Sequence, residues 1–203
     1  QRADVPVNFV GHPLVDAVKP QMTREQFAER FRLNAKEPIG ALLPWSRPAE
    51  IAHNLPRMLE ACRQLARDGK YQFVVAAAPG IVKECLQDHA RGGPPLHIVE
   101  GATYDALAAA DCAIVSSGTA TVEAALLGAP MVVVYRVSAT TAFIARRMVR
   151  TPFFSMVNLI AGRRVVPELI QEAYTPEAVA AEARRLLGSA EERETMRKDL
   201  AEV

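Results

Sequence analysis

The sequence predicts an α/β fold in which helices cover both faces of a parallel sheet. Five short apolar runs alternate with segments of helical pattern, at the spacing of βα units. The runs are apolar throughout, which is typical of strands buried on both faces of a sheet. They comprise residues 39–43, 71–78, 96–99, 113–115 and 131–135. Ligands bind at the carboxyl ends of such strands, so the loops after the runs are candidate sites.

The segments between the runs carry signals that begin and end helices. Thr23 and Gln26 form a capping-box pattern ahead of a helix that reaches about residue 33. Pro48 can begin a helix over 48–67, and Pro56 should kink it or divide it. We expect an irregular segment from 152 to 167. Further helices are predicted at 80–91, 103–110, 119–127, 138–149, 175–187 and 190–200, and a short strand-like run at 7–10.

Composition excludes several classes of function. The chain has 203 residues and half of them are hydrophobic, so it can bury a substantial core. Its net charge of +1 argues against a dedicated nucleic-acid binder. Cys62, Cys85 and Cys112 lack metal-ligand spacing and are interpreted as reduced core thiols. No apolar run reaches the 18 residues that a membrane span requires.

The stretch SSGTATVEAALLGAP, residues 116–130, follows one apolar run and reads as a turn and a helix that Gly128 can end. The first N–H groups of a helix have no internal partner, and the helix dipole favours an anion there. Gly118 would let a phosphate approach the backbone. We interpret the stretch as a nucleotide-diphosphate site, with Glu123 placed for sugar hydroxyls. An ordinary strand-to-helix turn with good capping residues remains the alternative.

Other candidate residues follow the strands or lie in the irregular segment. Arg47 comes directly after an apolar run, where its guanidinium could hold a phosphate; a solvated surface arginine is the alternative. Asn158 and Arg163 lie in a long irregular segment of the kind that is often functional, although Asn158 could simply cap a helix. No carboxylate pair or Ser-His-Asp order indicates a catalytic base. A basic cluster could attract an anionic lipid or complement a helix end: Arg146, Arg147 and Arg150.

Four motifs in order resemble the lipid-A-disaccharide synthase family. They are VGHPLVD (10–16), LLPWSRPAEI (42–51), SSGTATVEAALLGAPMVVVYRVS (116–138) and VNLIAGRRVVPELIQ (157–171). The resemblance covers nearly the whole chain but only the C-terminal half of a full-length family member. The third motif together with the fourth is specific, whereas the SGT helix alone is shared with other nucleotide-sugar glycosyltransferases.

The resemblance implies the C-terminal, Rossmann-like domain of a GT-B type glycosyltransferase. The family transfers 2,3-diacylglucosamine from its UDP carrier to 2,3-diacylglucosamine 1-phosphate, with inversion, and releases UDP. No metal or organic cofactor is expected. We therefore expect a hexosyltransferase whose partners are a UDP-sugar and a lipid acceptor, located in the cytoplasm and peripherally on the inner membrane; a homodimer is left open.

Site residues and domains follow from the motif match. Glu123 would bind the ribose hydroxyls, Arg47 a phosphate, and Asn158 and Arg163 would line the crevice for the UDP-sugar. The resemblance implies that the chain has three parts. They are a connector at 1–20, a UDP-sugar-binding domain at 21–174 and C-terminal helices at 175–203. The diphosphate would be held by Ser117, Gly118, Thr119 and Thr121.

Two departures from the family limit this interpretation. Trp45 stands where the family has a glycine, and an indole would obstruct a phosphate there, so we expect it to weaken binding. The N-terminal half, which carries the acceptor site and a catalytic carboxylate in the family, is expected upstream of Gln1. We expect this chain alone to be weakly active or inactive. A non-catalytic nucleotide-binding module, or another UDP-sugar glycosyltransferase or epimerase, is the alternative.

Overall fold

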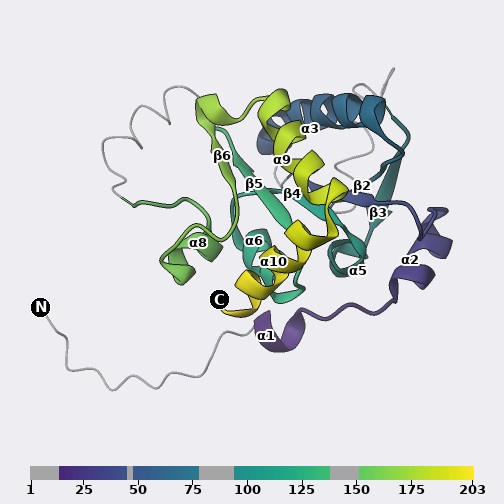
Figure 1. Ribbon diagram of the computed structural model, residues 1–203, viewed down its shortest axis with the longest axis horizontal. Helices are drawn as coiled ribbons and strands as arrows, with labels where there is room; N and C mark the ends of the chain where they lie inside the picture. The colour runs from purple at the N-terminus through teal and green to yellow at the C-terminus, as the bar shows by residue number, and fades with distance from the viewer. Residues whose placement is uncertain (1–13, 45–47, 78–93, 138–150) are drawn as a thin grey trace, which may run out of the picture.

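A single parallel sheet organises the part of the chain that the computed structural model describes, residues 14–44, 48–77, 94–137 and 151–203 (Figure 1). Within these residues the strand order is β3-β2-β1-β4-β5-β6, which is the order of the Rossmann fold. The strands are β1 (Ile39–Leu43), β2 (Gln72–Ala77), β3 (Leu96–Glu100), β4 (Cys112–Ser116), β5 (Met131–Tyr135) and β6 (Glu168–Ile170). Five of them coincide with the apolar runs, so the predicted parallel α/β sheet is confirmed.

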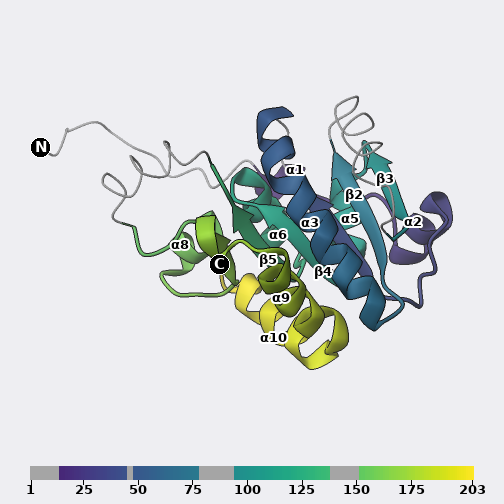
Figure 2. The same cartoon turned by 90° about the horizontal axis from the view of Figure 1, so that it is seen from above.

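Helices cover both faces of the sheet (Figures 1 and 2). α3 and α9 pack against each other on one face, and α5 and α6 lie together on the other. This arrangement follows from right-handed crossovers, since the chain moves from β1 to β2 in one direction and from β4 to β5 in the other. The helices are α1 (Leu14–Ala17), α2 (Arg24–Phe31), α3 (Pro48–Asp68), α5 (Thr103–Ala109), α6 (Thr119–Leu126), α8 (Met156–Ala161), α9 (Pro176–Gly188) and α10 (Ala190–Ala201), with a 3-10 turn at Gln171–Ala173.

The structure corrects two sequence predictions. α3 continues through Pro56 as one helix, so this proline does not divide it, and the alternative that Pro56 kinks the helix stays a prediction. The segment expected to be irregular contains α8, and β6 follows it as an added edge strand beside β5. The predictions at 7–10, 80–91 and 138–149 lie outside the described residues, as do Cys85, Trp45 and Arg47.

The structure confirms the helix starts that the sequence predicts for α2 and α9. Thr23 and Gln26 form the predicted capping box, in which the Thr23 N–H donates to Gln26 Oε1 over 2.9 Å. Thr175 caps α9 and Pro176 occupies its first turn. These pairs satisfy backbone N–H groups that a helix leaves without internal partners.

The two C-terminal helices pack on the same core as the sheet. α9 contributes Val179 and Leu186, and α10 contributes Met196 and Leu200, all of them buried. Tyr174 ties the start of α9 to α3, because its hydroxyl donates to the Asn54 carbonyl over 2.7 Å. The sheet and the helices after residue 175 therefore share one hydrophobic core, and the domain boundary at 174 stays a prediction.

The buried thiols agree with the interpretation of the cysteines as core residues. Cys62 and Cys112 are buried and unpaired. Burial raises the pKa of the Cys112 thiol to about 12 and shifts that of Cys62 upward as well. Both thiols are therefore protonated at neutral pH and are poor nucleophiles.

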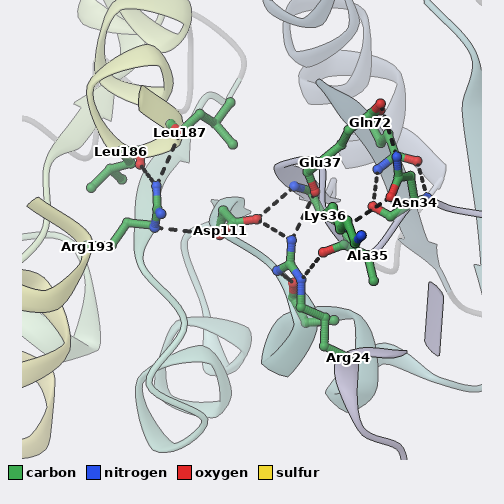
Figure 3. A network of polar contacts seen from close by, with 12 residues as sticks. Arg24, Asn34, Ala35, Lys36, Glu37, Gln72, Asp111, Leu186, Leu187 and Arg193 are labelled. Carbon is green, nitrogen blue, oxygen red and sulfur yellow. Dashed lines mark hydrogen bonds and ion pairs between the residues drawn. The ribbon is translucent and has the colours of Figure 1, made fainter. Parts of the chain in front are cut away.

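Asp111 connects the amino ends of the two central strands with helices from both ends of the chain (Figure 3). Its carboxylate accepts from the Ile39 N–H over 2.9 Å and from the Arg24 guanidinium over 2.8 Å. On its other side, Arg193 of α10 approaches to 3.5 Å and also donates to the Leu186 carbonyl at the end of α9. Arg24 further binds backbone carbonyls at Ala35, Glu37 and Ala109.

Removing this carboxylate should destabilise the whole domain. We expect Asp111→Ala to lower the free energy of unfolding by about 2–4 kcal/mol, because two guanidinium groups and an N–H lose a largely buried acceptor. Urea denaturation followed by circular dichroism measures the change. Asp199→Ala is the matched control, since its exposed pair with Arg163 should contribute no more than about 1 kcal/mol. Equal costs for the two variants would contradict the role given to Asp111.

Candidate functional site

The carboxyl ends of β1 and β4 define the crevice where a ligand is expected. The two strands are adjacent and parallel, with Leu43 opposite Val115. The connections that follow them run to opposite sides, towards β2 and towards β5. Such a topological switch point opens a crevice between the two loops, and ligands of open α/β sheets bind there.

The loop after β4 is a tight turn that presents the N-terminus of α6. Gly118 is the N-cap, and no described side chain caps the first N–H groups of this helix. Thr121 closes the turn, because its N–H and its hydroxyl both donate to the Gly118 carbonyl, over 3.1 and 2.7 Å. Thr119 is exposed at the first helical position. The turn therefore offers the backbone of Gly118 and Thr119 to a ligand.

Ser117 is held in place by bonds to neighbouring segments. Its N–H donates to the Val134 carbonyl over 2.8 Å, and its hydroxyl donates to the Phe154 carbonyl over 3.2 Å. Both hydrogen-bond donors of Ser117 are thus engaged, as are those of Thr121. Of the four residues predicted to hold a diphosphate, these two shape the turn, and contact of Gly118 and Thr119 with a ligand stays a prediction.

The residue before this turn has an unsatisfied polar group. The Ser116 hydroxyl is buried and has no hydrogen-bond partner among the described residues. A buried hydroxyl without a partner costs free energy. Ser116 ends β4, so this hydroxyl lies at the same edge of the sheet as the turn.

Gly128 ends α6 as the sequence predicts. Its φ of 62° lies in the left-handed region, which side chains with a Cβ seldom adopt. The Gly128 N–H donates to the Ala125 carbonyl and the Ala129 N–H to the Ala124 carbonyl, each over 2.9 Å. These two bonds form a Schellman motif that satisfies the last carbonyls of the helix. These bonds therefore end α6 at Leu126 and hold its C-terminal turn.

Glu123 lies one turn into α6 and faces a pocket of about 350 Å³. The pocket size is within the range of small-molecule sites. The Tyr104 hydroxyl of α5 donates to Glu123 Oε1 over 3.1 Å. The lining residues come from α6, the start of α5 and the segment before α2: Lys19, Gln21, Gly101, Ala102, Thr103, Tyr104, Asp105 and Glu123.

Asn158 lies in α8, and its side chain bonds with the segment that follows this helix. Its side chain is fully buried, and its carbonyl oxygen accepts from the N–H groups of Val165 and Val166 over 2.7 and 3.0 Å. Its amide nitrogen donates to the Val166 carbonyl and to the Glu168 carboxylate. In this structure Asn158 therefore shapes the loop behind the crevice, and direct contact with a ligand stays a prediction.

Glu168 extends this network to the turn before α6. Its carboxylate accepts from the N–H of Phe154 and from the N–H and hydroxyl of Ser155, over 3.0, 2.9 and 2.7 Å. The Phe154 carbonyl in turn accepts from the Ser117 hydroxyl. A chain of hydrogen bonds thus connects Asn158 to the loop after β4.

Arg163 lies on the surface and is paired with α10. Its guanidinium donates to Asp199 and to Glu202, each over 2.8 Å. Its side chain is 46% exposed. The structure therefore does not bring Arg163 together with Gly118, Thr119 and Glu123.

Sequence reasoning missed Tyr104 and Glu168. Tyr104 begins a helix in the sequence, and nothing in its local pattern indicates a partner 19 residues away. Nothing in the sequence around Glu168 indicates its bonds to Phe154, Ser155 and Asn158. Among the described residues, no group of three His, Cys, Asp or Glu side chains could hold a metal ion.

The fold defines a class of protein. The structure is similar to WaaG, described as a glycosyltransferase involved in lipopolysaccharide biosynthesis, with a TM-score of 0.57 and 14% identity over 94% of this chain and 49% of that one. It is also similar to UDP-GlcNAc 2-epimerase from Neisseria meningitidis, with a TM-score of 0.58 and 16% identity over 91% of this chain and 46% of that one. At such identities the likeness concerns the fold alone, which is the Rossmann-like domain of GT-B glycosyltransferases.

The sequence comparisons identify the family. A family model described as lipid-A-disaccharide synthetase matches residues 1–202, so the chain belongs to this family. The lipid-A-disaccharide synthase of Solibacter usitatus is 42% identical over the whole chain and 53% of its own length. That of Myxococcus xanthus is 43% identical over the whole chain and 54% of its own length. The chain thus spans about half the length of the curated relatives it matches.

The structural role of Asn158 can be tested by mutation. We expect Asn158→Ala to lower the free energy of unfolding by about 2–4 kcal/mol, because two buried N–H groups and a carbonyl lose their partners. Thermal or urea unfolding measures the effect. Leu159→Ala is the control, since this neighbouring side chain is 40% exposed and its loss should cost less than about 1 kcal/mol. A fully stable Asn158→Ala variant would contradict the structural role.

Proposed function

We propose that this protein is the donor-binding part of a glycosyltransferase of lipid A biosynthesis. The reaction transfers 2,3-diacylglucosamine from UDP-2,3-diacylglucosamine to 2,3-diacylglucosamine 1-phosphate, with inversion. The products are the lipid A disaccharide 1-phosphate and UDP. Membership of the family supports the reaction, and the uncapped N-terminus of α6 at the switch point of the sheet is the observation that carries the binding role.

The diphosphate is proposed to lie against the first turn of α6. The N–H groups of Gly118 and Thr119 and the Thr119 hydroxyl would donate to it, and the helix dipole would favour its charge. Ser117 and Thr121 would fix the shape of the turn through the bonds described above. Arg47, four residues after β1 in the sequence, is proposed to add a charge-assisted contact.

The nucleoside is proposed to occupy the pocket beside Glu123. A carboxylate accepts hydrogen bonds at both oxygens, which suits a ribose with two adjacent hydroxyl groups. Glu123 lies four residues after Thr119, so that both face one side of α6, about one turn apart. The spacing supports a single ligand that contacts both, with its diphosphate at the helix end and its ribose further along.

The chemical role proposed for this chain is stabilisation of the leaving group. In the transfer, the 6-hydroxyl of the acceptor sugar attacks C1 of the donor sugar and the bond from C1 to the diphosphate oxygen breaks. The electron pair of that bond leaves with UDP, and the hydroxyl proton passes to a base. Hydrogen-bond donors aimed at the diphosphate would stabilise the charge that develops there. The base and the acceptor site are proposed to belong to the remaining half of the family's chain.

We propose that the protein lies in the cytoplasm, peripherally on the inner membrane, where it would reach its lipid substrates. In the described part of the chain, no helix combines the length and the apolar character needed to cross a bilayer. Exposed apolar side chains gather on α8 at Met156, Leu159 and Ile160, and such a patch supports contact with an apolar partner.

Titration with UDP tests the binding role. We expect the chain to bind UDP weakly, and Glu123→Ala to lower the affinity by about tenfold or more, because a charged hydrogen-bond acceptor for the ribose is lost. Isothermal titration calorimetry gives both values. Glu60→Ala on α3 is the matched control and should leave the affinity unchanged.

The outcomes of this titration separate the candidate functions. Absence of UDP binding, or equal affinity of the parent and the Glu123→Ala variant, would contradict the proposed site. Binding without disaccharide synthesis when the remaining half of a relative is added would favour a non-catalytic nucleotide-binding module.

A further inference from the structure

We propose that Tyr104 is a positioning residue that orients Glu123 and thereby selects ligands whose sugar carries free hydroxyl groups. The inference rests on the proposed function, because it assigns Glu123 to the ribose. The observation that carries it is the bond from the Tyr104 hydroxyl to Glu123 Oε1, over 3.1 Å, at the edge of the pocket that both residues line.

The bond restrains the carboxylate and still leaves acceptor positions for a ligand. A carboxylate has about four acceptor positions on its two oxygens. Tyr104 occupies one of those on Oε1, and the others, including both on Oε2, remain for the ribose hydroxyl groups. An unrestrained glutamate side chain would lose rotamer freedom on binding, and this cost falls when the side chain is already held.

Tyr104 is itself held by an anchored helix. The next residue, Asp105, is buried, and its carboxylate accepts from the N–H groups of Gln21 and Met22 over 2.6 and 2.7 Å. At the other end of α5, the Ala109 carbonyl accepts from Arg24. The helix that carries Tyr104 is thus tied at both ends to the segment around α2, which also forms a wall of the pocket.

The phenol stays a hydrogen-bond donor under physiological conditions. Partial burial raises the pKa of the Tyr104 hydroxyl, and its bond to Glu123 and the charge of that carboxylate raise it further. The group is therefore protonated at neutral pH, and Glu123 is the acceptor of the pair.

The experiment compares two ligands on the 203-residue chain and its Tyr104→Phe variant. UDP has both ribose hydroxyls, whereas 2′,3′-dideoxy-UDP has neither. We expect Tyr104→Phe to weaken UDP binding by about threefold to tenfold and to leave dideoxy-UDP binding unchanged, because only the hydroxyl groups use the oriented carboxylate. Isothermal titration calorimetry measures the four affinities. The control is Tyr71→Phe, which removes a tyrosine hydroxyl group outside the pocket.

A double-mutant cycle checks that Tyr104 acts through Glu123. In the Glu123→Ala background, Tyr104→Phe should change UDP affinity by less than about twofold, since the group it orients is absent. An equal loss for both ligands would show a purely structural role and overturn the inference, and so would an unchanged affinity for UDP. A parent chain that does not bind UDP, or does not distinguish it from dideoxy-UDP, would instead overturn the proposed function on which the inference rests.

Discussion

The Asp111 carboxylate is the interaction on which the arrangement of the site depends. It lies at the amino ends of β1 and β4, the two strands whose carboxyl ends flank the switch point. Arg24 and Arg193 bring α2 and α10 to the same carboxylate, so both ends of the described chain converge there. These contacts hold together the amino ends of the two strands whose carboxyl ends carry the candidate site.

At the carboxyl ends of β1 and β4, some polar groups form bonds within the turn before α6, and others are proposed to bind a ligand. Ser117 and Thr121 use their donors on Val134, Phe154 and Gly118, and so keep the turn closed. The N-terminus of α6 then presents backbone N–H groups without a side-chain cap. In the proposed diphosphate site, the hydroxyl groups of Ser117 and Thr121 would fix the geometry of the turn, and the backbone N–H groups at the start of α6 would bind the anion.

Features encoded by neighbouring residues could be predicted from the sequence, whereas those that depend on distant partners could not. The apolar strands, the capping box at Thr23 and the stop at Gly128 follow from short-range patterns. β6 has three residues and is held by pairing with β5, so no local signal marks it. The role of Asn158 depends on a turn that brings Val165 and Val166 back to it, and the bond from Tyr104 to Glu123 joins two helices. Candidate site residues could therefore be recognised in the sequence, but their hydrogen-bond partners became apparent only in the structure.

A crystal structure of the chain with UDP would test the central claim most directly. The account predicts diphosphate oxygens within about 2.7–3.2 Å of the backbone N–H groups at the start of α6, and a ribose hydroxyl at the same distance from the Glu123 carboxylate. A diphosphate bound elsewhere on the sheet, with the turn at Gly118 unoccupied, would contradict it.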